Sequence, residues 1–268
     1  MAVITVSKEL AALGDESARE IAKLSGYRLV DKQVLEDRMG RNGLEAENFK
    51  KYDERKPSFL ASLLDDREYY IHYLRKAVFD EAQIGDCVIV GRGANAILKG
   101  LPALISVFLS APVAVRIERV KSYFHCDEKR AEQIIEHSDR DKAGFHRSFF
   151  DIDWRHPVNY HLSFNTGLLT PGDCAEIVNS FKDRVFTQEA QAGNAVMLKN
   201  ILLSHKIEHS ILYEQELPVR FIDVSVCEST AVVYGIVASG NLVDAVVSAA
   251  KEAAGEGIDV RAEIQILG

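Results

Sequence analysis

An arginine between two glycines follows a short apolar run in the sequence CVIVGRG. It is Arg92, flanked by Gly91 and Gly93. A guanidinium presents a planar fork of N–H donors that can hold a phosphate through two oxygens, and flanking glycines let the backbone come close to such a ligand. We therefore predict that this turn binds a phosphate group. The alternative is an ordinary surface arginine at the end of a strand.

A second candidate is the sequence SKELAALGDES, which follows the apolar run AVITV. A phosphate-binding loop occupies this position before a first helix, and it uses glycines, a lysine and a Ser or Thr to hold phosphates and magnesium. Here Gly14 is the single glycine, and no lysine follows it. If Ala11 takes a positive φ, the strain is about 1–2 kcal/mol. We predict a degenerate phosphate loop, with a turn that binds no phosphate as the alternative. The candidate residues are Lys8, Ala11, Ala12, Gly14, Asp15, Glu16 and Ser17.

The elements that carry these residues alternate between apolar runs and helical patterns. Near-continuous apolar runs such as CVIV and ALISVFL are typical of parallel strands that are covered on both faces. In such α/β sheets, ligands bind beyond the carboxyl ends of the strands. The Arg92 turn, the 7–17 loop, Asp31 and Asn165 each follow a predicted strand, so we expect them at one edge of the sheet.

Two domains are predicted. Residues 1–190 form an α/β domain with a parallel sheet and helices on both faces, and residues 191–268 form a small α+β domain with the order α-β-β-α-β. Within the first domain we expect residues 42–58, which are polar and charged, to be a connection, and residues 59–83 to form a long helix.

Composition limits the function classes. The 268 residues are 47% hydrophobic and carry a formal net charge of −8. This charge argues against broad attraction to nucleic acid or to an anionic membrane. The four cysteines show no CxxC or zinc-like spacing, so we expect reduced thiols and no metal site. With no signal peptide and no apolar run of membrane-spanning length, we expect a cytoplasmic protein.

The order of these motifs resembles the cytidylate-kinase-like family, a branch of the nucleoside-monophosphate kinases. The resemblance covers about residues 1–187 and is most specific in VIVGRGANAILKGLP, VFLSAP, RIERV and YHLSFNTG. It implies the P-loop kinase fold. It also implies transfer of the γ-phosphoryl group of ATP, with Mg²⁺, to CMP or a similar small-molecule nucleotide.

The resemblance also implies roles for individual residues. Arg92 would hold the phosphate of the acceptor, although Gly93 stands where the family has an acid. Arg140 and Arg147, which share a face of a predicted helix in DRDKAGFHR, would close as a lid over the transferred group. Asp31 and Asn165 would lie near the nucleotide. The alternatives are a solvated charged helix for the two arginines, a helix cap for Asp31 and a turn for Asn165.

A second function hypothesis is a non-catalytic nucleotide or phosphate sensor. A phosphate-holding arginine and a lid that are retained beside an eroded donor loop would suit such a protein, with the C-terminal domain as its output. That domain, with its strand AVVYGIV, resembles BON-type domains. We expect it to sense a small ligand or to form a homodimer.

Overall fold

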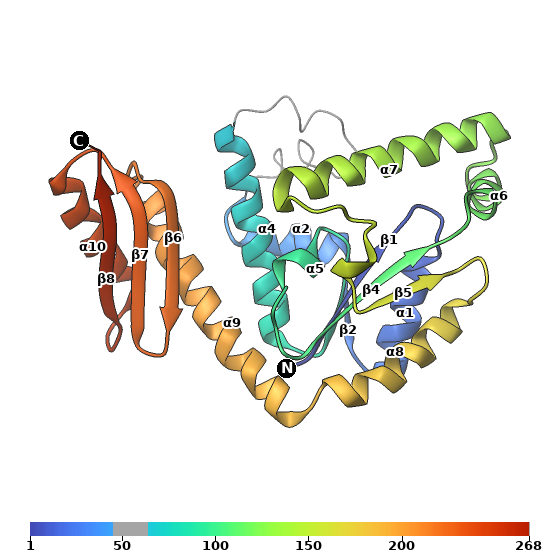
Figure 1. The fold of residues 1–268 in the computed structure, drawn as a ribbon, viewed down its shortest axis with the longest axis horizontal. Coiled ribbons are helices and arrows are strands. Elements are labelled where there is room, and N and C mark those ends of the chain that lie inside the picture. The colour runs from blue at the N-terminus through green and yellow to red at the C-terminus, as the bar shows by residue number, and fades with distance from the viewer. Residues whose placement is uncertain (45–63, 268) are drawn as a thin grey trace. The chain divides into compact units, whose positions relative to one another are not determined.

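The computed structural model describes residues 1–44 and 64–267. These residues form two compact units, Met1–Asn194 and Ala195–Gly268, which we describe one at a time (Figure 1). We call them the first and the second unit. The expected connection 42–58 lies outside the described residues from residue 45 onward.

The first unit is built on a five-stranded parallel sheet with the order β2-β3-β1-β4-β5. This arrangement confirms the predicted α/β fold with a parallel sheet. The three central strands are almost wholly buried, as their near-continuous apolar sequences predict. The strands are β1 (Val3–Lys8), β2 (Arg28–Val30), β3 (Cys87–Val90), β4 (Leu104–Ser110) and β5 (Leu162–Asn165).

Helices pack on the sheet, where α1 and α8 lie against each other and α4 contacts α5 and β3. The hydrophobic core lies between the sheet and α1 and α8, and it includes Ile4, Ile21, Ile105 and Val178. The helix predicted over residues 59–83 is described as α4 from Leu64 onward. The helices of the first unit are α1 (Gly14–Ser25), α2 (Lys32–Arg41), α4 (Leu64–Ile84), α5 (Ala94–Ile97), α6 (Val113–Phe124), α7 (Glu128–Phe150) and α8 (Pro171–Val185), followed by the first turns of α9 (Gln188–His209).

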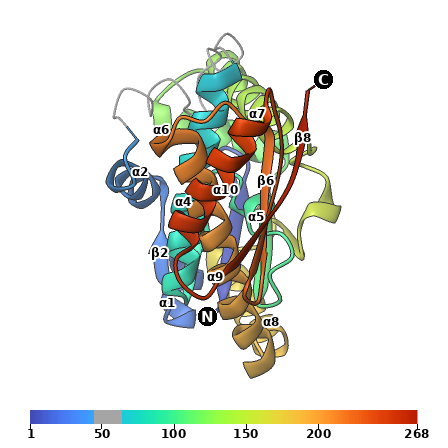
Figure 2. The ribbon, with the colours of Figure 1, turned by 90° about the vertical axis from the view of Figure 1, so that its left-hand side faces the viewer.

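The second unit contains the end of α9, a π-helical turn (Ser210–Glu214), β6 (Arg220–Cys227), β7 (Thr230–Val237), α10 (Gly240–Ala254) and β8 (Asp259–Ile266). Strand β7 pairs antiparallel with β6 and parallel with β8, and α10 packs on the sheet (Figure 2). This small α+β unit has the predicted α-β-β-α-β order.

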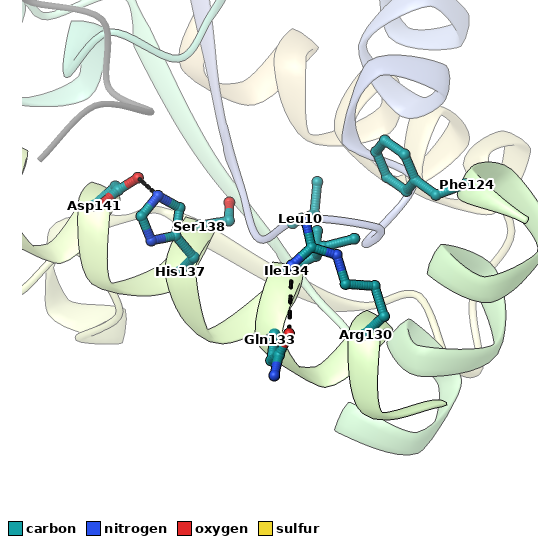
Figure 3. Close-up of a pocket in the computed structure, with 8 residues that line it drawn as sticks. All are labelled: Leu10, Phe124, Arg130, Gln133, Ile134, His137, Ser138 and Asp141. Atoms are coloured by element: carbon teal, nitrogen blue, oxygen red, sulfur yellow. Dashed lines mark hydrogen bonds and ion pairs between the residues drawn. The ribbon is translucent and has the colours of Figure 1, made fainter. Parts of the chain in front are cut away.

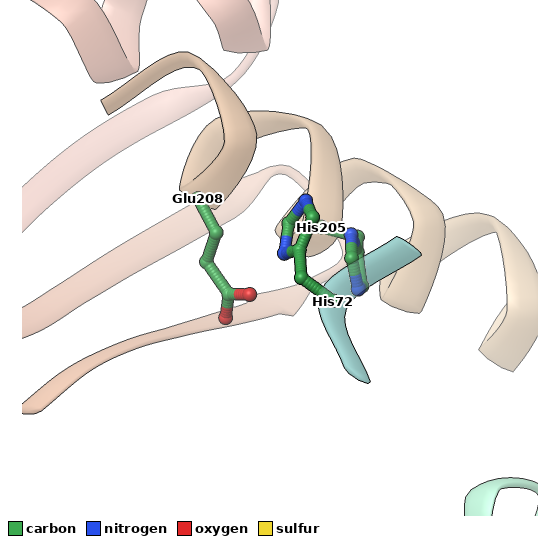
Figure 4. A group of neighbouring side chains, drawn as sticks. All are labelled: His72, His205 and Glu208. Carbon is green, nitrogen blue, oxygen red and sulfur yellow. The ribbon is translucent and has the colours of Figure 1, made fainter. Parts of the chain in front are cut away.

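Side chains of the second unit form a core of their own. Ile207, Val233 and Ala250 are fully buried within it. Figure 4 shows His205 and Glu208 one turn apart on α9. The Oε1 atom of Glu208 accepts a hydrogen bond from the N–H of Val224 at 3.3 Å, which ties α9 to β6.

None of the helices in the described part of the chain is both long enough and apolar enough to span a membrane.

Candidate phosphate-binding site

The sheet topology brings the ends of β1 and β3 together. Val6 pairs with Val90, and the N–H of Gly91 donates to the carbonyl of Val6 at 2.9 Å. The Arg92 turn therefore lies beside Ser7 and Lys8. A cavity of about 420 Å³ opens between this turn, the 7–17 loop, α2 and α7. Its charged lining residues are Lys8, Asp15, Asp31, Lys32, Glu36, Arg92 and Lys142.

The glycines around Arg92 serve a left-handed turn. Gly91, Arg92 and Gly93 have φ angles of 73°, 54° and 68°. This conformation costs a non-glycine residue about 1–2 kcal/mol. A Cβ on Gly93 would lie 2.2 Å from the ring of Phe150, so α7 can pack here only because residue 93 has no side chain.

The side chain of Arg92 is buried, with 4% of the residue exposed. Its Nη2 lies 3.0 Å from Oε1 of Glu36 on α2, and its Nη1 lies 3.4 Å from the hydroxyl of Tyr70 on α4. A buried guanidinium held by a carboxylate has a defined orientation, because breaking the ion pair would leave both charges poorly solvated. The cavity thus contains a preoriented cation.

The 7–17 loop has the positive φ angles that the sequence analysis associated with strain. Ala11 and Leu13 have φ angles of 60° and 53°. Hydrogen bonds from side chains to three of its backbone carbonyls hold the loop in place. Arg116 Nε donates to Leu10 at 2.8 Å, Arg119 Nη1 donates to Ala11 at 3.0 Å, and Thr166 Oγ1 donates to Ala12 at 3.0 Å.

The cation of the loop is already paired. Lys8 forms an ion pair with Asp15, the residue directly after Gly14, where a phosphate loop carries its lysine. The side chain of Lys8 lies across Gly14, since a Cβ on Gly14 would be 2.4 Å from two of its carbons. An acid therefore faces the N-terminus of α1, where an anionic ligand would otherwise be favoured.

The other loop residues offer little to a magnesium ion. Ser17 is fully buried, and its hydroxyl donates to the carbonyl of Leu13 at 2.7 Å. Ala12 is buried, and Glu16 is exposed in the first turn of α1. The hydroxyl that the sequence suggested for Mg²⁺ thus lies beneath the loop, so we assign no Mg²⁺ ligand there.

A buried ion network below the loop was not found from the sequence. Arg116, which is 1% exposed, bonds both carboxylate oxygens of Asp139 at 3.0 and 2.8 Å. It also lies 3.3 Å from Glu9, and Arg155 contacts the same two acids. Arg116 lies in the quoted motif RIERV. Its partners Glu9 and Asp139 lie far from it along the chain, so no local pattern of residues predicts the network.

The residues of α7 that face the cavity differ from those that the sequence suggested. Lys142 and His146 line the cavity, whereas Arg140 and Arg147 are exposed and do not. Lys142 Nζ donates to the carbonyl of Lys8 at 2.7 Å. The ring of His146 stacks on that of Trp154 at 5.8 Å, and its Nδ1 donates to the carbonyl of Lys142 at 2.9 Å. The lid role of the two exposed arginines stays a prediction.

Asp31 and Asn165 have local roles in the structure. Asp31 caps α2, because its Oδ1 accepts from the N–H of Val34 at 3.1 Å, and it also lines the cavity. Asn165 Oδ1 accepts from the N–H of Gly167 at 2.9 Å in a turn, and it lies outside the cavity lining. Both hydrogen bonds correspond to the capping and turn alternatives that the sequence left open.

A neighbouring cavity of about 460 Å³ lies between the 7–17 loop, the end of α6 and the first half of α7 (Figure 3). Leu10, Phe124 and Ile134 supply its apolar lining. His137 Nε2 lies 3.3 Å from Oδ2 of Asp141 at the other end of the row of residues in Figure 3. The 7–17 loop thus contributes to both cavities, with Lys8 and Asp15 in the lining of the first and Leu10 in the lining of the second.

A comparison with solved structures finds proteins that are similar to two thirds or more of this chain. An uncharacterized protein from Eubacterium ventriosum is 19% identical, with a TM-score of 0.54 over 68% of this chain and 99% of that chain. Shikimate kinase from Acinetobacter baumannii is 16% identical, with a TM-score of 0.40 over 70% of this chain and 96% of that chain. A gluconokinase from Sinorhizobium meliloti is 20% identical, with a TM-score of 0.39 over 75% of this chain and 95% of that chain.

A comparison with curated protein sequences finds no match. A model of the cytidylate kinase-like family matches residues 3–168, which is more than half of the chain and includes β1 to β5. The match ends before the second unit, so it gives no support to the predicted resemblance of residues 191–268 to BON-type domains. From this match, the chain belongs to the cytidylate kinase-like family.

Proposed function

We propose that the first unit binds a nucleoside monophosphate of the CMP or dCMP type in the Arg92 cavity, as the acceptor of a phosphoryl group from ATP. One observation carries the proposal. A buried, preoriented guanidinium lines a cavity at the carboxyl ends of β1 and β3, where ligands bind in α/β sheets. The family match supports the same reading.

The charges around the cavity suit a phosphate. Lys8, Lys32 and Lys142 line it together with Arg92, against three carboxylates. A phosphate that enters beside Arg92 would compete with Glu36 for the guanidinium and would accept charge-assisted hydrogen bonds, which are about twice as strong as neutral ones. Asp31 and Glu36 on the α2 side would then face the nucleoside rather than the phosphate.

In the proposed reaction, an oxygen of the acceptor phosphate attacks the γ-phosphorus of ATP. The bond from that phosphorus to the bridging oxygen breaks, and ADP leaves with the electron pair. The acceptor is already ionised, so no general base is needed, and catalysis comes from positioning and charge neutralisation. Lys142 and Arg92 are the residues that we propose neutralise charge, and Arg140 and Arg147 would act only if the lid moves.

A specific observation favours the second candidate, a monophosphate sensor without catalysis. Asp15 pairs with Lys8 at the position of the phosphate-loop lysine, and the hydroxyl of Ser17 is buried. Both features weaken the donor side while the acceptor side keeps Arg92. A sensor needs only the acceptor side.

Thermal stability with added nucleotides separates the two candidates. A ligand that binds only the folded state raises its stability by RT ln(1 + [L]/Kd), so millimolar ligand reveals weak binding. We expect CMP to raise the melting temperature, and ATP with Mg²⁺ to raise it further if the protein is a kinase. Stabilisation by CMP alone supports the sensor. No stabilisation by any of CMP, dCMP, UMP or AMP contradicts the proposed site.

A coupled assay of ADP release then measures turnover. We expect Arg92→Ala to abolish CMP-dependent ADP release. Lys23→Ala, on the exposed side of α1, is the matched control and should leave it unchanged. CMP-dependent turnover that Arg92→Ala does not alter would rule out this cavity as the acceptor site.

A further inference from the structure

A separate cavity of about 570 Å³ lies between α5, the starts of β4 and β5, and the end of α7 in the first unit. Leu104 and Ser106, at the start of β4, line it, and so does His161, directly before β5. The Arg92 cavity lies instead at the carboxyl ends of the strands. The two cavities share no lining residue.

Two cations line this cavity. Arg75 of α4 and Lys99, just after α5, are both exposed, and neither side chain makes a hydrogen bond or ion pair with the part of the chain that the structure describes. Asp151 is the one acid among the lining residues. The cavity therefore has a local excess of positive charge on a chain whose net charge is −8.

Part of the cavity wall is apolar. Phe149 and Phe150, from the end of α7, and Leu101 and Leu104 line the cavity, and both leucines are buried. Small-molecule sites typically have volumes of about 300–1,000 Å³ and combine such apolar walls with a few polar groups. The volume here falls in that range.

His161 adds a defined hydrogen-bond donor. Its Nδ1 accepts from the backbone N–H of Ser106 at 2.9 Å, so in the neutral ring the proton resides on Nε2. Burial lowers the pKa of His161 below its ordinary value of 6.5, which keeps the ring neutral at pH 7. The ring offers an N–H donor without adding a charge.

We propose that this cavity binds a small organic acid, with its apolar body against Phe149 and Phe150 and its anionic group at Arg75 and Lys99. The inference does not rest on the proposed function, because none of these residues lines the Arg92 cavity. A neutral apolar ligand would leave the two cations unused, and a fully polar anion would gain nothing from the aromatic wall.

The test is calorimetric titration of the full chain with 2-naphthoate, and with uncharged 2-naphthamide of the same shape. We expect naphthoate to bind and naphthamide to bind at least several-fold more weakly. Arg75→Met and Lys99→Met keep the apolar stems of the side chains and remove their charges. Each should weaken naphthoate binding about three- to tenfold, because the cation that it removes is exposed and water screens its attraction to the carboxylate, and the double variant should weaken it further.

A control variant locates the binding. Lys251→Met removes an exposed cation of the second unit and should leave naphthoate affinity unchanged. The proposal is overturned if naphthoate does not bind at 1 mM, if naphthamide binds equally well, or if the double variant binds like the wild type.

Discussion

Position 92 lets strain and ligand binding be separated by one pair of substitutions. Arg92→Gly and Arg92→Ala both remove the guanidinium and its contacts with Glu36 and Tyr70. They differ in backbone preference, since residue 92 has a φ of 54°, which glycine adopts freely and alanine does not.

The expected magnitudes follow from this geometry. Left-handed backbone costs alanine about 1–2 kcal/mol, and glycine loses about 0.4–1 kcal/mol through the entropy of its unfolded state. We therefore expect Arg92→Gly to be more stable than Arg92→Ala by about 1 kcal/mol. Both variants lose a charge-assisted contact worth about 1.5–3 kcal/mol, so CMP affinity should fall by roughly 10- to 150-fold in each.

The stability difference is measured by urea unfolding, and CMP affinity by calorimetric titration. Lys23→Ala serves again as the control for both measurements. If Arg92→Ala is at least as stable as Arg92→Gly, residue 92 does not have the left-handed backbone conformation. If the stability order holds but both variants bind CMP like the wild type, the turn is right and the phosphate site lies elsewhere.

Three further substitutions test the Arg116 ion network, the 7–17 loop and the cavity lined by His161. Arg116→Met should destabilise the protein by about 3 kcal/mol in urea unfolding, because it removes the buried partner of Glu9 and Asp139 and leaves them only the half-exposed Arg155, and a loss under about 1 kcal/mol would contradict the buried network. Asp15→Asn should release Lys8 and raise the thermal stabilisation by ATP, whereas an unchanged shift would show that the ion pair does not restrict the donor loop. Burial lowers the pKa of His161, so the unfolded chain binds a proton more readily than the folded one, and the free energy of unfolding should decline as the pH falls below about 6.5. His161→Asn, whose Oδ1 can still accept the hydrogen bond from the backbone, should show a smaller decline between pH 7.5 and 5.5. An identical decline would refute the burial effect.

Local sequence determined the strands and the turn at the centre of the site. Continuous apolar runs such as CVIV can be satisfied only by burial on both faces, which in a chain of alternating helices means a parallel sheet. The glycines beside Arg92 indicated a turn after the strand, and the positive φ that the sequence analysis considered for Ala11 is present at 60°. These features depend on residues close together in sequence, so the pattern alone predicts them.

The charges that face the cavity were decided by tertiary structure. The sequence put Arg140 and Arg147 on a common helix face, but the rotation of α7 against the sheet turns Lys142 and His146 inward. The pairing of Arg116 with Glu9 joins residues more than a hundred positions apart, and no local period encodes it. A helix pattern specifies which side chains share a face, whereas the packing of distant elements specifies what that face meets. Long-range packing therefore selected the cations of this site from the many that the sequence offered.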